Sequence, residues 1–179
     1  MVDQHPSTSL DDLDLALLAT LHAYPRIGDM ELSRRAKVAR ATVQSRLRRL
    51  QDAGVITSWG PEVDPAAAGF PVQAFITLEI AQGALEQVAA DLASIPQVLE
   101  AYVTTGSADV LCKVATSSHA ELQTTLLHLN GSPAVVRSTS VVALSVLVAP
   151  RILPLLDSAA PLRTGRAPAY RRPRSAPEP

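Results

Sequence analysis

The chain has a single cysteine, Cys112, among its 179 residues, so no disulfide can form within it. It also has no run of about 18 or more apolar residues, the length that a membrane-spanning helix needs. Its opening residues, MVDQHPSTSLDDLD, carry neither the basic start nor the apolar stretch of a secretory signal. We therefore expect a cytoplasmic protein that makes no contact with a membrane.

The patterns that carry catalysis or bind metals are also missing. The four histidines show no metal-ligand spacing. Cys112 alternates with Val110 and Val114 on an apolar strand, as a core cysteine does. The chain has no glycine-rich phosphate loop and no nucleophile elbow around a serine. We therefore expect no metal, no cofactor and no enzymatic activity.

Charge is present, but it is unevenly distributed along the chain. The net charge is −1, yet seven basic residues and one acid lie between Ser33 and Asp52. Residues 71–150 carry two basic residues and six acids. One short segment is therefore suited to meet a polyanion, and the larger part of the chain is not.

The basic segment belongs to a pattern of three short helices, which follows residues 1–9, expected to be disordered. The expected helices and the strand after them span 10–24, 29–37, 40–53 and 55–59. Ser9 with Asp12 fits a capping box for the first helix, and Gly54 is suited to end the third. The inward apolar residues at helical spacing are Leu10, Leu13, Leu17, Leu18 and Leu21, then Met30, Leu32 and Ala36, then Val43, Leu47 and Leu50. Three short helices with a tight turn before a basic third helix are typical of a helix-turn-helix domain, here 10–59.

The pattern changes after a connector at 60–71, which holds three prolines and two glycines. A second domain is expected over 72–149, with its elements in the order βαββαβ. Their expected spans are 72–80, 84–95, 98–105, 109–115, 117–129 and 138–148. This order forms a four-stranded antiparallel sheet with both helices on one face. The other face is also largely apolar, and a partner subunit is its natural cover. Residues 150–179, rich in arginine and proline, are expected to be a disordered tail.

The exposed side of the third helix carries the chemistry of DNA recognition. Helix-turn-helix proteins lay this helix in the major groove, where Gln44 can pair with adenine and Arg46 with guanine. The outward residues are Thr42, Gln44, Ser45, Arg46, Arg48 and Arg49. The expected phosphate contacts are Arg34, Arg35, Lys37 and Arg40. The alternatives are a solvated basic face, or arginines paired with acids of the first helix.

Four stretches of the chain carry a family resemblance. They are LDDLDLALLATL in the first helix, ATVQSRLRRLQDAGVI at 41–56, VDPAAAGF at 63–70 and VTTGSADVLCKV at 103–114. In this order and spacing the chain resembles the Lrp/AsnC (feast/famine) family of prokaryotic transcription regulators. The resemblance implies an α+β protein with a winged-type helix-turn-helix and a ferredoxin-like sensor domain. It also implies homodimers, often assembled into octamers, that bind double-stranded DNA and a small effector, commonly an amino acid.

The resemblance also singles out a candidate effector site. The family's Thr-Gly-x-x-Asp turn is matched by Thr105, Gly106 and Asp109 at a strand-turn-strand corner. Glycine permits close backbone approach, and exposed amides beside an acid could hold both charged ends of an amino acid. Ser138 and Ser140, where the family often has threonines, are candidates for a second wall. The alternative is a plain hairpin in which Asp109 caps its own turn.

Two further points about the DNA-binding half come from the resemblance. The serine that usually caps the recognition helix is matched by Ala39, a weaker cap by about 1 kcal/mol. For Arg46 two roles stay open, a base contact and a structural bridge between helices.

These features together predict a sequence-specific DNA-binding transcriptional regulator that is modulated by a small effector. An enzyme built on the ferredoxin-like fold is a competing function, which the missing catalytic cluster argues against. An effector-binding or assembly module without sequence-specific DNA readout is the other alternative. Steep salt dependence of binding would separate a DNA-binding protein from such a module.

Overall fold

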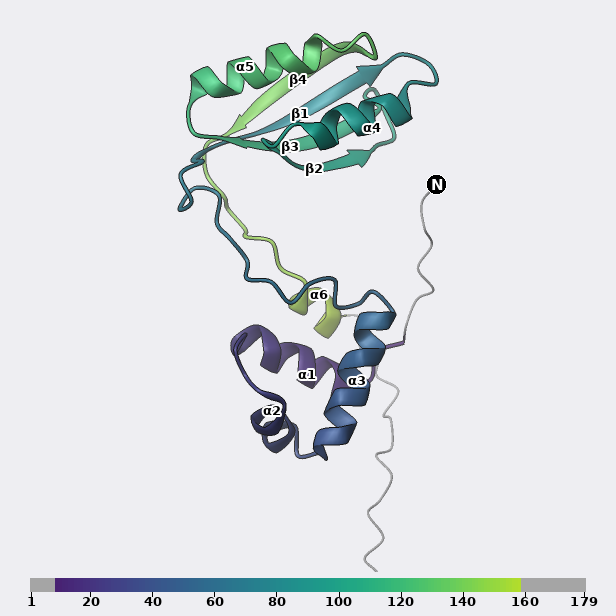
Figure 1. Cartoon of the computed structure of the whole chain (residues 1–179), viewed down its shortest axis with the longest axis vertical. Coiled ribbons are helices and arrows are strands. Elements are labelled where there is room, and N and C mark those ends of the chain that lie inside the picture. The colour runs from purple at the N-terminus through teal and green to yellow at the C-terminus, as the bar shows by residue number, and fades with distance from the viewer. Residues whose placement is uncertain (1–8, 159–179) are drawn as a thin grey trace, which may run out of the picture. The chain divides into compact units, whose positions relative to one another are not determined.

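The computed structural model describes residues 9–158. The chain divides between residues 61 and 62 and again between 149 and 150, so that among the described residues one unit holds both the N-terminal helices and residues 150–158 (Figure 1). The predictions for residues 1–8 and for the arginines of the tail from Arg163 on lie outside the described residues. Within the described residues, no helix is long and apolar enough to cross a membrane.

Three helices of the first unit form the predicted helix-turn-helix. They are α1 (Asp12–Ala23), α2 (Asp29–Ala36) and α3 (Arg40–Asp52). Leu17, Leu32 and Val43 are at most 1% exposed and form a core with Leu47. Burial of each such side chain contributes about 1.5–3 kcal/mol. The left-handed conformation of Lys37, with φ 54°, ends α2 and turns the chain toward α3.

The start of α1 differs from the prediction. Asp11, in an extended conformation, is the cap, and its carboxylate accepts the Asp14 amide at 3.0 Å. The Asp14 carboxylate in turn accepts the Asp11 amide at 3.0 Å. The capping box is therefore Asp11 with Asp14, and the predicted pair of Ser9 with Asp12 is wrong. This start of the helix puts the Asp14 side chain in the interior, where it is 0% exposed.

Two other local predictions for this unit are wrong. Met30 is 74% exposed, because Leu32 defines the buried side of α2 and a residue two positions away points to another side. Residues 55–59 form no strand. The first two amides of this segment donate to the Leu50 carbonyl at 2.9 and 3.1 Å, so they end α3 and are not free to pair with a strand.

The segment after residue 150 also differs from the expected disordered tail. Residues Leu153–Ser158 form a short helix, α6, which contacts α1 within the first unit (Figure 1). Leu153 and Leu156, one turn apart, are half-buried. The prediction of disorder is therefore wrong for these residues, because an apolar LPLL run that can pack against a neighbouring helix becomes ordered.

The second unit has the predicted βαββαβ order and a four-stranded antiparallel sheet, β2-β3-β1-β4 (Figure 1). Its elements are β1 (Val72–Ile80), α4 (Leu85–Ser94), β2 (Val98–Val103), β3 (Val110–Thr116), α5 (His119–Asn130) and β4 (Val135–Ala143). Ala74, Ile76 and Leu78 of β1 are fully buried against α4 and α5. Cys112 joins this core, as predicted, and burial raises the pKa of its thiol to about 11.

The opposite side of the sheet, the open face, carries no helix of this unit. Phe75 is 44% exposed there, and its register partners are Lys113 on β3 and Val141 on β4. Tyr102 of β2 is 54% exposed. Large apolar side chains on a solvent-facing sheet are typical of a surface that another subunit covers.

The limits of β4 differ from the predicted span of 138–148. The strand begins at Val135 and ends at Ala143. Its last residue pairs with Gln73 of β1, and Pro71, just before β1, has no amide hydrogen to extend the ladder. Residues beyond Ala143 therefore have no partner strand, although their apolar side chains resemble a strand in sequence.

Candidate nucleic-acid interface and effector corner

The outer side of α3 is exposed because its inner side fills the core. Val43, Leu47 and Leu50 are at most 9% exposed, as predicted from their spacing. The opposite side bears a surface depression lined in part by Gln44, Ser45 and Arg48. These three side chains are exposed, whereas Thr42 is half-buried at the edge of this side.

Gln44 is held by an acid from the neighbouring helix. Its Nε2 donates a hydrogen bond of 2.8 Å to Oδ2 of Asp29, the first residue of α2. Among the side-chain hydrogen bonds of residues 9–158, this one alone joins α2 to α3. The amide therefore has a defined orientation before any DNA arrives.

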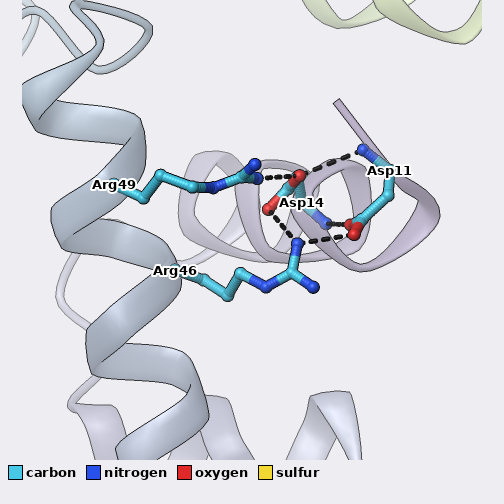
Figure 2. A network of polar contacts seen from close by, with 4 residues as sticks. All are labelled: Asp11, Asp14, Arg46 and Arg49. Carbon is cyan, nitrogen blue, oxygen red and sulfur yellow. Dashed lines mark hydrogen bonds and ion pairs between the residues drawn. The ribbon is translucent and has the colours of Figure 1, made fainter. Parts of the chain in front are cut away.

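The guanidinium groups of Arg46 and Arg49 reach acids at the start of α1 (Figure 2). The Arg46 guanidinium lies 2.5 Å from Asp11 Oδ2 and 3.2 Å from Asp14 Oδ1. Arg49 forms an ion pair with the other oxygen of Asp14. The prediction of an outward Arg46 is corrected by this network, because the buried carboxylate of Asp14 requires charged partners. Arg49 pairs with Asp14 but stays exposed, and it lines the same depression as Gln44.

The network also shifts the titration of its more exposed acid. Burial raises the pKa of Asp11, but hydrogen bonds from the Asp14 amide and from Arg46 more than offset this, so the pKa lies below the ordinary 3.8. The Asp11 contacts raise the pKa of the Arg46 guanidinium. Both groups are therefore charged at neutral pH, and the recognition helix is tied to the start of α1 by full ionic charges.

The predicted phosphate-binding residues fall into two groups. Arg34 and Arg35 form ion pairs with Glu31 at 2.6 and 2.9 Å, and Arg35 also lies over the Tyr24 ring at 4.1 Å. These exposed pairs contribute little stability and can exchange for phosphate. The other group forms no ion pair within the described residues, and it consists of Lys37 and Arg40. Arg48, one of the predicted outward residues of α3, forms none there either.

The predicted effector corner joins β2 to β3. Gly106 has φ +119°, a conformation that side-chain-bearing residues rarely adopt. Asp109 Oδ2 accepts the Ile80 amide at 2.8 Å, and the Asp109 amide donates to the Leu78 carbonyl at 2.9 Å. Asp109 therefore caps the end of β1, where the register of the β1–β4 pair shifts, and the predicted alternative of a cap on its own turn is wrong.

The two candidate serines lie beside this corner on β4. Ser138 pairs with Leu78 of β1, the residue whose carbonyl Asp109 contacts, and Ser140 pairs with Ile76. Ser138 is half-buried and Ser140 exposed. The fold thus brings Ser138 closest to the corner, with Ser140 two residues further along the same strand.

Comparison with known proteins identifies the family. Residues 73–153 match a family model described as the Lrp/AsnC ligand binding domain, and residues 10–57 match a winged helix-turn-helix DNA-binding model. The chain is 32% identical over 126 residues to the HTH-type transcriptional regulator FL11 of Pyrococcus horikoshii, covering 70% of this chain and 83% of that protein. The chain belongs to the Lrp/AsnC family. It is therefore a DNA-binding transcriptional regulator with a ligand-binding domain.

Solved structures of Lrp/AsnC regulators have the same fold. Escherichia coli AsnC has a TM-score of 0.76 at 27% identity, over 82% of this chain and 100% of that one. A Neisseria meningitidis regulator solved in complex with L-Met has a TM-score of 0.72 at 26% identity, over 79% of this chain and 94% of that one. The curated relative AldR of Mycolicibacterium smegmatis is 34% identical over 64% of this chain and 68% of its own length.

Sequence reasoning missed the acids that organise this Lrp/AsnC interface. The sequence pattern assigns Asp14 only to the positive end of the first helix and gives Asp29 no role at the interface, although it leaves open that the arginines pair with acids of the first helix. Asp14 lies four residues from Leu10 and Leu18, so it sits within an apolar helix, which is a signal of a buried carboxylate. No comparable signal marks Asp29, because the loop geometry alone brings it to Gln44.

Proposed function

We propose that the regulator reads its operator through Gln44, Ser45 and Arg48 on the outer side of α3. Lys37 and Arg40 contact phosphates, joined by Arg34 and Arg35 when phosphate replaces Glu31. Thr42 borders this surface and contacts the backbone of the DNA. The observation that carries the proposal is one exposed helix face with an amide, a hydroxyl and a guanidinium, beside cations with no ion-pair partner in residues 9–158.

Arg46 and Arg49 have a positioning role in this proposal. Their ion pairs with the first turn of α1 support the structural role of Arg46 that the family resemblance left open. To contact a base, the Arg46 guanidinium would have to break its ion pairs with Asp11 and Asp14. The free energy lost by breaking them is comparable to the free energy gained from one arginine–base contact.

Base readout and phosphate contact are expected to separate by mutation. Gln44→Ala should lower the preference for the selected operator over random DNA by about 1–3 kcal/mol. Arg40→Ala should weaken binding to both DNAs equally and reduce the slope of log K against log salt by about 1. Fluorescence anisotropy titrations at several salt concentrations measure both effects.

Gln123→Ala is the matched control, since Gln123 is an exposed glutamine on α5, in the other unit. It should change neither quantity. Equal losses on operator and random DNA for Gln44→Ala would refute base readout by this residue. Binding that does not depend on salt would instead favour an assembly module without DNA readout.

A second copy of the chain is the proposed cover of the open face. Phe75, Tyr102 and Val141 are exposed there, and a symmetric dimer would bury them against their own copies. Such a dimer also presents two recognition helices to two operator half-sites. Assembly of dimers into octamers is the further step that the family resemblance implies, and cytoplasmic location follows from access to DNA.

An amino acid is the proposed effector, bound at the corner of Thr105, Gly106 and Asp109 with Ser138 and Ser140 beside it. The match of residues 73–153 to a ligand-binding domain and the L-Met complex of the Neisseria regulator support this class of ligand. One oxygen of Asp109 is bound to the Ile80 amide. The carboxylate charge is therefore held in place at an exposed corner, where an ammonium group can approach it.

At least one proteinogenic amino acid is expected to raise the melting temperature or change the sedimentation of the wild-type protein. At a hundredfold excess over Kd the gain in stability is about 2.7 kcal/mol. Asp109→Asn should abolish the response, because the asparagine oxygen can still accept the Ile80 amide while the charge is lost. If no amino acid alters melting or size in the wild type, the effector proposal fails.

A further inference from the structure

Asp29 is an acid at the edge of a basic surface. It is the first residue of α2, half-buried, and its Oδ2 accepts the hydrogen bond of 2.8 Å from Gln44 Nε2. Lys37, which ends α2, and Arg40 and Arg48 of α3 are exposed cations of the same unit. A carboxylate at a DNA-binding surface repels phosphate and so weakens binding. The hydrogen bond from Gln44 to Asp29 is a contact whose benefit to DNA recognition could offset that cost.

The chemistry of the contact fixes which way the Gln44 amide points. An ionised carboxylate has no hydrogen to donate, so it can only face the NH2 side of the amide. The amide carbonyl, Oε1, is then directed away from Asp29. The assignment of nitrogen and oxygen thus follows from the partner and does not depend on how the amide is drawn.

This orientation determines which base the amide can read. Adenine offers an acceptor at N7 and a donor at N6, which match one N–H and the carbonyl of a glutamine amide. Guanine offers two acceptors, N7 and O6, which need both N–H groups. With one N–H held by Asp29, Gln44 retains the pair of groups that adenine needs and lacks the pair that guanine needs.

We propose that Asp29 is a specificity-determining residue, which holds the Gln44 amide so that the regulator accepts adenine and rejects guanine at one operator position. The inference rests on the proposed function, since it requires Gln44 to contact a base. Asp29 also lowers the entropy cost of ordering a long side chain at the interface, because that side chain is ordered beforehand.

The test begins with selection of bound sequences from a random DNA pool by the full-length wild-type protein. Gln44→Ala identifies the position at which Gln44 acts, because the preference is lost there alone. At that position the wild type should prefer adenine over guanine by at least about fivefold. Asp29→Ala should reduce this preference by at least about twofold, because its freed Gln44 amide can also turn an N–H toward guanine N7 or O6.

The charge of Asp29 provides a second readout with the opposite sign. Asp29→Ala removes a negative charge near the phosphates, so its affinity for random DNA should rise while its base preference falls. Asp52→Asn is the matched control, because Asp52 borders the same depression as Gln44 and forms no ion pair within residues 9–158. It should raise affinity for random DNA and leave the adenine preference unchanged.

The double variant Asp29→Ala with Gln44→Ala completes the test. If the two residues act as one unit, it should show the same base preference as Gln44→Ala alone. An Asp29→Ala protein that folds and keeps the full adenine preference overturns this inference and leaves the proposed function standing. A wild-type protein that selects no sequence overturns the proposed function and this inference together.

Discussion

Replacement of Asp14 by alanine is expected to destabilise the helix-turn-helix unit by about 2–4 kcal/mol. The Asp14 side chain is 0% exposed and ion-pairs with Arg46 and Arg49, whose side chains are 30% and 43% exposed. Its removal breaks these charge-assisted bonds and one half of the capping box with Asp11. Because both arginines can turn to water, the loss stays below the cost of stranding a fully buried charge.

Fluorescence of the single tryptophan can follow this transition during urea unfolding. Trp59 belongs to the same unit, and its indole N–H donates to Gln51 of α3 at 3.3 Å. Asp12→Ala is the control, since Asp12 is an exposed acid in the same first turn and should cost at most about 1 kcal/mol through the helix dipole. Equal stabilities of the two variants would show that the buried network contributes nothing.

The second large effect is expected from a charge on the open face of the sheet. Phe75→Glu should convert the proposed dimer into monomers, because a symmetric interface would bury two new carboxylates with no partner. Loss of simultaneous binding to two half-sites should weaken operator binding by at least about a hundredfold. Sedimentation velocity measures the size, and titration of operator DNA measures the affinity.

Leu127→Glu controls for the loss of an exposed apolar side chain elsewhere. Leu127 is 67% exposed on α5, on the other side of the sheet. This variant should keep the size and the affinity of the wild type. A Phe75→Glu protein that sediments as the wild type does would exclude the open face as the dimer interface, whatever its effect on DNA binding.

The sequence predicts the order of helices and strands better than it predicts where each strand ends. The buried side of α3, formed by Val43, Leu47 and Leu50, follows from helical periodicity, because residues three or four positions apart lie on the same side of a helix. The βαββαβ order follows in the same way from local periods and turn residues. Strand limits were less predictable, since β4 ends at Ala143 where β1 stops offering partners.

The errors share a physical origin. The apolar run of α6 is too short to predict a helix by itself, and it is ordered because it packs against α1. Residues 55–59 have the composition of a strand, but their first amides end α3. In each case a tertiary or capping contact decides the local structure. The intrinsic preference of these residues for helix, strand or coil differs by too little free energy to oppose that contact.

The order of the elements, the inward side of α3 and the resemblance to the Lrp/AsnC family all follow from the sequence, because each depends on local periodicity and motif spacing. The partners of the polar side chains on α3 depend instead on tertiary contacts. Arg46 meets Asp14, 32 residues away, and Gln44 meets Asp29, 15 residues away. Contacts at such separations depend on how helices cross and which rotamers fit. For this reason two arginines of α3 are paired with acids of α1, and Gln44 is hydrogen-bonded to an acid of α2.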